Sequence, residues 1–104
     1  MLALAGAGSA MAPTKVNGIV GPGFTIFVKN LRGQVVKTLK PGTYAFLVQD
    51  KSNIHSFTIK GPGVNNVGTS VPFVGRKTVT VTLKRGTYTF YCTLHLFKTT
   101  VRVG

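Results

Sequence analysis

The chain of 104 residues contains one cysteine and two histidines, the side chains best suited to holding a metal ion. Cys92 and His95 lie three positions apart, and His55 lies much earlier in the chain. A thiolate and two imidazoles form a soft donor set that suits copper. Taken singly, a buried thiol often acts as a small hydrophobic group, and each histidine could be an ordinary polar residue at a strand end. Taken together, they favour a site for one copper ion, cycling between Cu(I) and Cu(II).

Two predicted strands must position these ligands. In the segment 87–92, strict alternation puts Cys92 on the same face as Phe90. The same alternation puts His55 on a face with Phe57. We therefore expect both ligand-bearing segments to pack against one core, with the ligands close to strand ends.

The rest of the chain has the composition of a small all-β domain. Apolar residues make up 43% of the sequence and charged residues only 13%, so a packed core is expected. Frequent glycine, proline, valine and threonine favour short strands joined by tight turns, and no stretch shows a sustained helical period. Strands are predicted at 24–29, 35–39, 43–48 and 78–83, with 61–77 as a long loop or weak strands.

Two features favour a sandwich of two sheets. The segment 43–48 is apolar on both faces, which indicates a central strand. The segments 39–46 and 83–90 match at six of eight positions, and each forms a corner that leads into a strand. Similar corners in two halves fit a two-sheet Greek-key β-sandwich.

The ligand-bearing segments resemble those of a known family. The segment 91–95, Tyr-Cys-Thr-Leu-His, resembles the Cys-x-x-His ligand loop of small cupredoxins of the plastocyanin and amicyanin type. The segment 50–57 is similar to the stretch that supplies their first histidine, and the likeness extends over a domain from about 16 to 104. The resemblance implies a cupredoxin-like sandwich that transfers one electron through copper bound by His55, Cys92 and His95.

The chain departs from this family at the axial position, where a methionine is usual. Its only methionines, Met1 and Met11, lie in the leading segment. The possible axial or capping groups are Phe97, Lys98 and the backbone carbonyl of Ile54, with Thr99 or Thr100 reached only by longer loops. Without a thioether donor, Cu(I) is favoured and a raised reduction potential is expected. A degenerate site that binds copper poorly is the other interpretation.

The resemblance also assigns roles around the ligands. Ser56 replaces the usual asparagine after the first histidine, and its hydroxyl is expected to reach the region of Thr93. Such outer bonds orient ligands and tune the metal. His95 would be the ligand nearest the surface and the port for electrons. Leu94, Leu96 and Phe97 around it would form an apolar docking patch.

The segment 1–12 is uncharged and rich in alanine and glycine. Ala10 and Ala12 form an Ala-x-Ala pattern typical of a signal-peptide cleavage site, although the basic leading region is missing. The segment is too short to span a bilayer, so no transmembrane segment is expected. We expect a truncated signal peptide, with a disordered leader as the alternative, and hence a periplasmic or secreted protein.

The charge balance points to negatively charged partners. Thirteen Lys and Arg residues against one acid, Asp50, give a net charge of +12. Such a field speeds encounters with acidic molecules. We expect an acidic redox partner, with an anionic envelope polymer as a further partner. Nucleic-acid binding is not expected, because strand alternation places most aromatic side chains on the face toward the core, where they cannot stack on bases.

No enzyme signature is present. One acidic residue excludes a carboxylate pair, no Ser-His-Asp triad is evident, and no phosphate-binding glycine loop occurs. The main interpretation is a monomeric copper-binding electron-transfer protein. The alternatives are a copper-binding or storage module without redox shuttling, and a metal-free basic β-sandwich that binds acidic partners.

Overall fold

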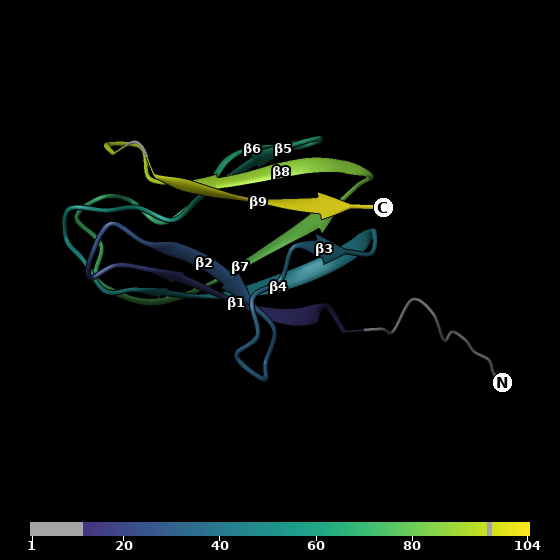
Figure 1. Cartoon of the computed structure of the whole chain (residues 1–104), viewed down its shortest axis with the longest axis horizontal. Coiled ribbons are helices and arrows are strands. Elements are labelled where there is room, and N and C mark those ends of the chain that lie inside the picture. Colours follow the sequence, from purple (N-terminus) through teal and green to yellow (C-terminus); the bar gives the residue numbers. More distant parts are fainter. Residues whose placement is uncertain (1–11, 96) are drawn as a thin grey trace, which may run out of the picture.

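The computed structural model describes residues 12–95 and 97–104, apart from the side chains at positions 66 and 67. This part of the chain forms nine strands and no helix (Figure 1). The strands are β1 (Thr14–Val20), β2 (Ile26–Lys29), β3 (Thr38–Leu39), β4 (Gly42–Asp50), β5 (Thr58–Gly61), β6 (Val64–Gly68), β7 (Gly75–Leu83), β8 (Gly86–Tyr91) and β9 (Lys98–Val103). Most of the leader expected at 1–12, together with Leu96, lies outside the described residues.

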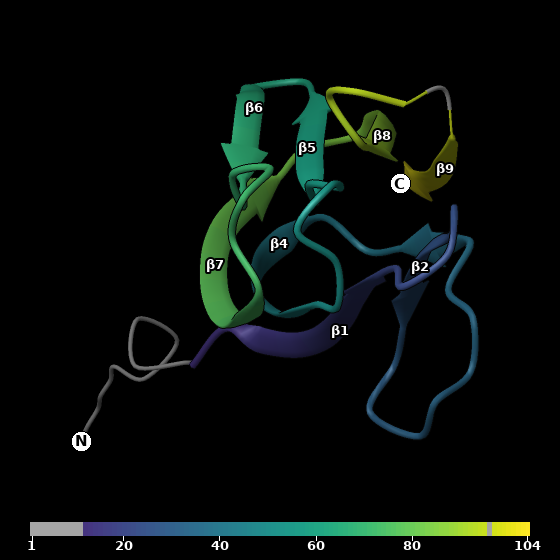
Figure 2. The ribbon, with the colours of Figure 1, turned by 90° about the vertical axis from the view of Figure 1, so that its left-hand side faces the viewer.

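The strands form two sheets that face each other (Figure 2). One sheet has the order β2-β1-β4-β7 and the other the order β3-β9-β8-β5-β6. Both sheets are mixed, because β1 runs parallel to β4 and β3 runs parallel to β9. The predicted all-β sandwich is confirmed, and the segment 43–48 does lie in a central strand, β4.

The stretch 61–77 is more regular than predicted. It contains β6 and the start of β7, and β6 forms a hairpin with β5. Three features made this hairpin difficult to predict from the sequence. Gly63 takes a positive φ of 73° in the turn, β6 carries two asparagines, and Gly68 ends the strand. A side chain at Gly68 would collide with the backbone carbonyl of Phe57, which explains the break in alternation.

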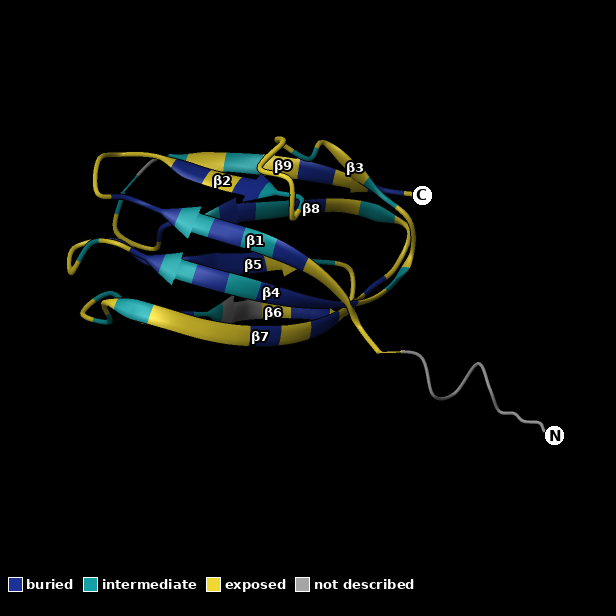
Figure 3. Ribbon diagram, turned by 90° about the horizontal axis from the view of Figure 1, so that it is seen from below, coloured by how far each residue is buried: buried dark blue, intermediate teal, exposed yellow. Residues whose placement is uncertain are grey.

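The core fills the space between the sheets, and alternate residues of each strand face it (Figure 3). Phe46 of β4 packs against Phe90 of β8 and Phe57 beside β5, with ring centroids 5.5 and 6.5 Å away. Phe57 and Phe90 are themselves 5.6 Å apart. Each ligand-bearing segment therefore places one aromatic ring in a shared cluster, which fixes the two segments relative to each other.

In each of the repeated corners, at 39–46 and 83–90, a tyrosine hydroxyl forms a hydrogen bond with the backbone of the residue four positions earlier. Tyr44 donates a hydrogen bond to the Lys40 carbonyl at 2.6 Å. The Tyr88 hydroxyl accepts one from the Lys84 amide at 2.9 Å and donates one to the Pro62 carbonyl at 2.5 Å. Both corners close turns at the end of the sandwich where β4 and β8 begin. This is the tyrosine-corner device of Greek-key sandwiches.

Four connections meet at the opposite end of the sandwich: 21–25, 51–57, 69–74 and 92–97. Strand pairing brings them together, because Asp50 lies opposite Gly75 and Tyr91 opposite Thr58. Figure 2 looks onto this end of the molecule. In the described part of the chain, there is no helix with the length and apolar character needed to cross a membrane.

Candidate metal centre

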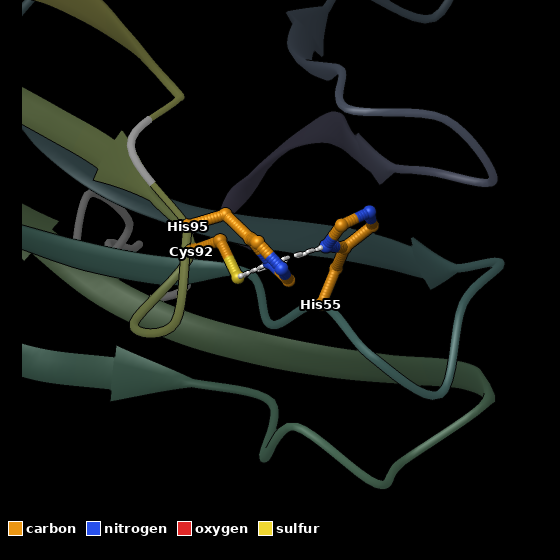
Figure 4. A group of neighbouring side chains, drawn as sticks. All are labelled: His55, Cys92 and His95. Carbon is orange, nitrogen blue, oxygen red and sulfur yellow. Dashed lines mark hydrogen bonds between the residues drawn. The ribbon is translucent and has the colours of Figure 1, made fainter.

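His55, Cys92 and His95 meet at this end of the sandwich. His55 comes from the 51–57 connection, whereas Cys92 and His95 come from the connection after β8, and all three side chains point toward one another (Figure 4). The two histidine Nδ1 atoms are 3.0 Å apart. Cys92 Sγ lies 3.9 Å from His55 Nδ1 and 3.7 Å from His95 Nδ1. His55 and Cys92 are buried and His95 is half-buried.

The two sulfur–nitrogen distances fit trigonal ligands around one ion, whereas the 3.0 Å between the nitrogens is shorter than the about 3.5 Å of that geometry. Bonds of about 2.0 Å to nitrogen and about 2.3 Å to sulfur, as in zinc sites, separate the two donor atoms by about 3.7 Å at a trigonal angle. The observed sulfur–nitrogen distances of 3.7 and 3.9 Å match that separation. Two imidazole nitrogens at 3.0 Å also repel each other unless a proton or a cation lies between them. The group is therefore compatible with binding one metal ion.

Ser56 links the two ligand-bearing connections. Its amide donates a hydrogen bond to Cys92 Sγ at 3.3 Å. Its hydroxyl accepts one from the Thr93 amide at 3.0 Å and lies 3.2 Å from Thr93 Oγ1. The structure thus brings together the two residues that the sequence placed around the ligands. The bonds hold the thiol in a fixed position relative to His55.

The surroundings of Cys92 lower its pKa and so favour the thiolate form. Burial alone would raise the pKa of Cys92, but hydrogen bonds from the Leu94 amide, the His95 side chain and the Ser56 and His95 amides outweigh it. Together they lower the pKa of Cys92 to about 6. Because the thiolate is the metal-binding form, this environment favours metal binding at neutral pH.

This shift predicts how the stability of the metal-free protein depends on pH. The folded-state pKa of about 6 lies below the ordinary value of 9.0, so the native protein binds fewer protons than the unfolded chain between these values. The thiolate's contribution is complete above the unfolded pKa and is lost as the pH falls through the folded pKa. We expect the free energy of unfolding to decrease on acidification across this window, by at most about 1.4 kcal/mol per pH unit.

Urea unfolding of the metal-free protein at several pH values measures this dependence. The matched control is Cys92→Ala, which keeps every other titrating group. In the control, the free energy of unfolding should depend less steeply on pH, because the contribution of the thiol is absent. Equal slopes in both proteins would show that the folded protein does not favour the thiolate.

Asp50 and Thr69 brace the connection that carries His55, a feature that sequence reasoning missed. Asp50, the only acid of the chain, is buried; its carboxylate accepts hydrogen bonds from the Ser52 amide at 3.1 Å and the Thr69 hydroxyl at 3.0 Å. Thr69 Oγ1 in turn accepts a hydrogen bond from the Phe57 amide at 2.9 Å. Burial raises the pKa of Asp50, while these two donors and the nearby charge of His55 act in the opposite direction.

Thr69→Val should lower the free energy of unfolding by at least about 2 kcal/mol. The substitution leaves the Phe57 amide without an acceptor and removes a donor from Asp50, and each buried group left unpaired costs about 1–3 kcal/mol. Thr69→Ser is the matched control, because it keeps the hydroxyl and loses one methyl group worth about 0.8 kcal/mol. Urea unfolding measures both. If serine destabilises the protein as much as valine, the hydroxyl does not brace this connection.

The second ring nitrogen of His55 is buried without a hydrogen-bond partner among the described residues. If Nδ1 binds a metal, the neutral ring must carry its proton at this Nε2. Gly21, with φ of 72°, lies beside the ring and Ser52: a Cβ there would make an ordinary contact with His55 Cδ2 at 3.6 Å but would crowd Ser52 Cβ at 2.9 Å. A histidine whose outer N–H has no acceptor is a weaker electron donor to a metal.

Two phenylalanine rings border the imidazole pair. The Phe24 ring packs edge-on against His55 and His95, with centroids 4.9 and 4.8 Å away. The Phe97 ring lies 4.8 Å from His55 and stacks on His95 at 6.2 Å. Phe24 was predicted to begin a strand at 24–29, but β2 begins at Ile26, so Phe24 lies in the connection before it and its contact with the ligands was missed. The two rings cover one side of the ligand group.

The positions considered for an axial or capping group differ in their surroundings. Phe97 contacts both imidazoles and offers no donor atom. Lys98 is exposed at the start of β9, opposite Tyr91. Ile54 directly precedes His55 and its side chain is 48% exposed. Among the described residues there is no methionine.

Comparison with known proteins finds similar chains among solved structures only. No protein-family model and no curated protein matches the chain. Among solved structures, rusticyanin from Thiobacillus ferrooxidans is similar, with 22% sequence identity and a TM-score of 0.47 over 89% of this chain and 79% of that one. The chain's own two-sheet sandwich, with a His-Cys-His group at one end, fits a small blue copper protein.

Proposed function

We propose that the protein is a copper-binding electron-transfer protein. One copper ion would be held by His55 Nδ1, Cys92 Sγ and His95 Nδ1. The observation that supports this most strongly is the convergence of one thiol and two imidazoles whose atoms all lie within 4.8 Å of one another. Two imidazoles and one thiolate in a trigonal arrangement are the donor set of blue-copper electron-transfer centres. Copper bound there would supply one-electron chemistry by alternating between Cu(I) and Cu(II).

The residues around the ligands support fast electron transfer. The Ser56–Thr93 bonds, the Asp50–Thr69 brace and the aromatic cluster hold the two ligand-bearing connections on one rigid scaffold. Ligands held in place by such bonds cannot rearrange freely when the charge on the site changes. Little reorganisation between the two oxidation states is therefore expected.

We further propose that the centre lacks a thioether ligand and has a raised reduction potential. Phe97 and Phe24 occupy the space beside the imidazoles, and Lys98 is exposed, which leaves the Ile54 carbonyl as the remaining weak donor. Weak axial donation and a nonpolar surrounding disfavour the extra charge of Cu(II). Cyclic voltammetry of the copper-loaded protein measures this potential directly.

The surface beside His95 has the character of a docking patch. Leu94 is 64% exposed and Phe24 is 63% exposed, and Phe97 and Ile54 lie beside the same ligands. Leu96, the third member expected from the sequence, lies outside the described residues. We propose that a redox partner docks on these side chains, and that the net charge of +12 favours an acidic one.

An electron carrier is proposed in preference to an enzyme. The only side-chain carboxylate, on Asp50, is buried and hydrogen-bonded, so it does not face a substrate. The protein is proposed to act as a monomer outside the cytoplasm, as the Ala-x-Ala pattern of the leading segment suggests.

Voltammetry also separates electron transfer from copper storage. The copper-loaded protein should give a reversible one-electron wave that survives many cycles. A storage module would bind Cu(I) tightly and release the metal, or give no return wave, on oxidation. A protein that takes up no copper would leave the metal-free sandwich that binds acidic partners as the better interpretation.

A further inference from the structure

The strand β7 forms an open edge of the four-stranded sheet. It pairs with β4 on one side, and the order β2-β1-β4-β7 leaves its other side without a neighbouring strand in the described part of the chain. β7 is nine residues long, and much of it is exposed (Figure 3). A long free edge offers a row of backbone N–H and C=O groups to any extended chain that lies alongside it.

The second part of β7 has the composition of a segment that pairs with copies of itself. Residues 78–83 alternate three threonines with Val79, Val81 and Leu83, and they include no charged residue, proline or glycine. The three apolar side chains are buried, and the threonines are exposed on the outer face of the sheet. Uncharged stretches of six residues with high β-propensity are typical of strands that add to an identical strand.

Lys77 interrupts this pattern immediately before the uncharged segment. It lies opposite Val48 of β4, whose side chain is buried, so both side chains start on the face of the sheet toward the core. The Lys77 side chain does not enter the core: its Nζ donates a hydrogen bond to the Gly68 carbonyl at 3.1 Å, at the end of β6 in the other sheet. The ammonium group therefore spans the open side between the two sheets and stays exposed to water.

A second copy of β7, added antiparallel to this edge, would cover that ammonium group. Pairing centred on Val79 aligns the two strands over their full length, and pairing centred on Thr80 aligns 78–82 with itself. Because opposite residues share a face, Lys77 then lies against Val81 or Leu83 of the second copy. The ammonium group would lose water and gain an apolar neighbour, which is unfavourable.

We propose that the free edge of β7 is a self-pairing surface that Lys77 keeps closed. The edge has the composition to accept β7 of a second copy, and the lysine on its core-facing side prevents this pairing. Inward-pointing charged residues on edge strands are one of the means by which β proteins avoid edge-to-edge association. The proposal does not depend on copper, because β7 carries none of the three residues of the metal centre.

Sedimentation equilibrium of the metal-free full chain, in about 0.15 M salt, tests this proposal. Lys77→Val removes the ammonium group and extends the row of apolar side chains. Arg76→Val is the matched control, because it removes the same charge and introduces the same side chain one position earlier, on the outer face opposite Gln49. Lys77→Arg keeps the charge. Circular dichroism shows whether each variant keeps its fold.

The natural chain and Lys77→Arg should remain monomeric. Lys77→Val should form dimers at least about 100-fold more tightly than the natural chain, because two ammonium groups no longer lose water, each worth about tenfold or more. Arg76→Val should gain less than about tenfold, since exposed charges are screened beyond about 8 Å at this salt concentration.

Two results would overturn the proposal. A folded Lys77→Val that stays monomeric would show that the edge does not pair with itself. Equal dimerisation of the two valine variants would show that net charge or strand propensity, rather than the inward position of Lys77, controls association. If Lys77→Val precipitates, Lys77→Thr takes its place with the same expected and contradicting results, because it removes the charge without adding a fully apolar side chain.

Discussion

Cys92→Ala is expected to abolish the intense visible absorption of the copper-loaded protein. That absorption arises from charge transfer between the thiolate and copper, and Cys92 is the only thiol in the chain. Loss of outer-shell partners alone typically lowers metal affinity about 10- to 100-fold, so loss of a ligand should lower copper affinity by more than about 100-fold. Titration with Cu(II), followed by visible and EPR spectra, measures both effects.

The stability of the same variant provides the control. Cys92 is only 3% exposed, yet replacing its sulfur by hydrogen removes one heavy atom from a well-packed site. Below about pH 6, where the thiol is protonated in both the folded and the unfolded state, the metal-free variant should therefore remain folded, with a loss of about 1 kcal/mol, comparable to one buried methylene. An intense visible band that persists in the folded variant would contradict the assignment of Cys92 as a ligand.

Phe90→Ala is expected to have the largest effect on stability, lowering the free energy of unfolding by about 3–5 kcal/mol. Phe90 is fully buried and contacts the rings of Phe46 and Phe57 at 5.5 and 5.6 Å. Its removal would leave a cavity between the sheets, close to both ligand-bearing connections. In a domain of ordinary stability, about 5–15 kcal/mol, this is a large fraction of the total. Urea unfolding of the metal-free protein measures the loss.

Copper binding should respond to the same substitution. Phe90 lies two residues before Cys92, and Phe57 lies two residues after His55, so the cavity loosens both ligands. Phe90→Leu is the matched control, because it keeps most of the buried volume and should cost much less than alanine. If alanine and leucine destabilise the protein equally, the aromatic cluster does not have the role assigned to it here.

Alternation in the sequence was sufficient to predict the parts of the structure that depend on single strands. The side chains of Phe90 and Cys92 are buried as the period of two predicts. The central position of the segment 43–48, now within β4, also followed from its apolar character on both faces. These predictions succeed because a strand with one buried face leaves its pattern in consecutive residues.

Features that depend on contacts between distant segments could not be predicted in this way. The Asp50–Thr69 bond joins residues 19 positions apart and requires the pairing of four strands to be known. Phe24 lies in a connection without a period, and its contact with both imidazoles arises from the meeting of four such connections at one end.

The most direct test of the account is the crystal structure of the copper-loaded protein, with anomalous scattering recorded at the copper edge. The account predicts one copper ion bonded to Cys92 Sγ, His55 Nδ1 and His95 Nδ1, with no thioether ligand. An ion bound elsewhere, or an anomalous peak to which the sulfur of Cys92 is not bonded, would contradict it.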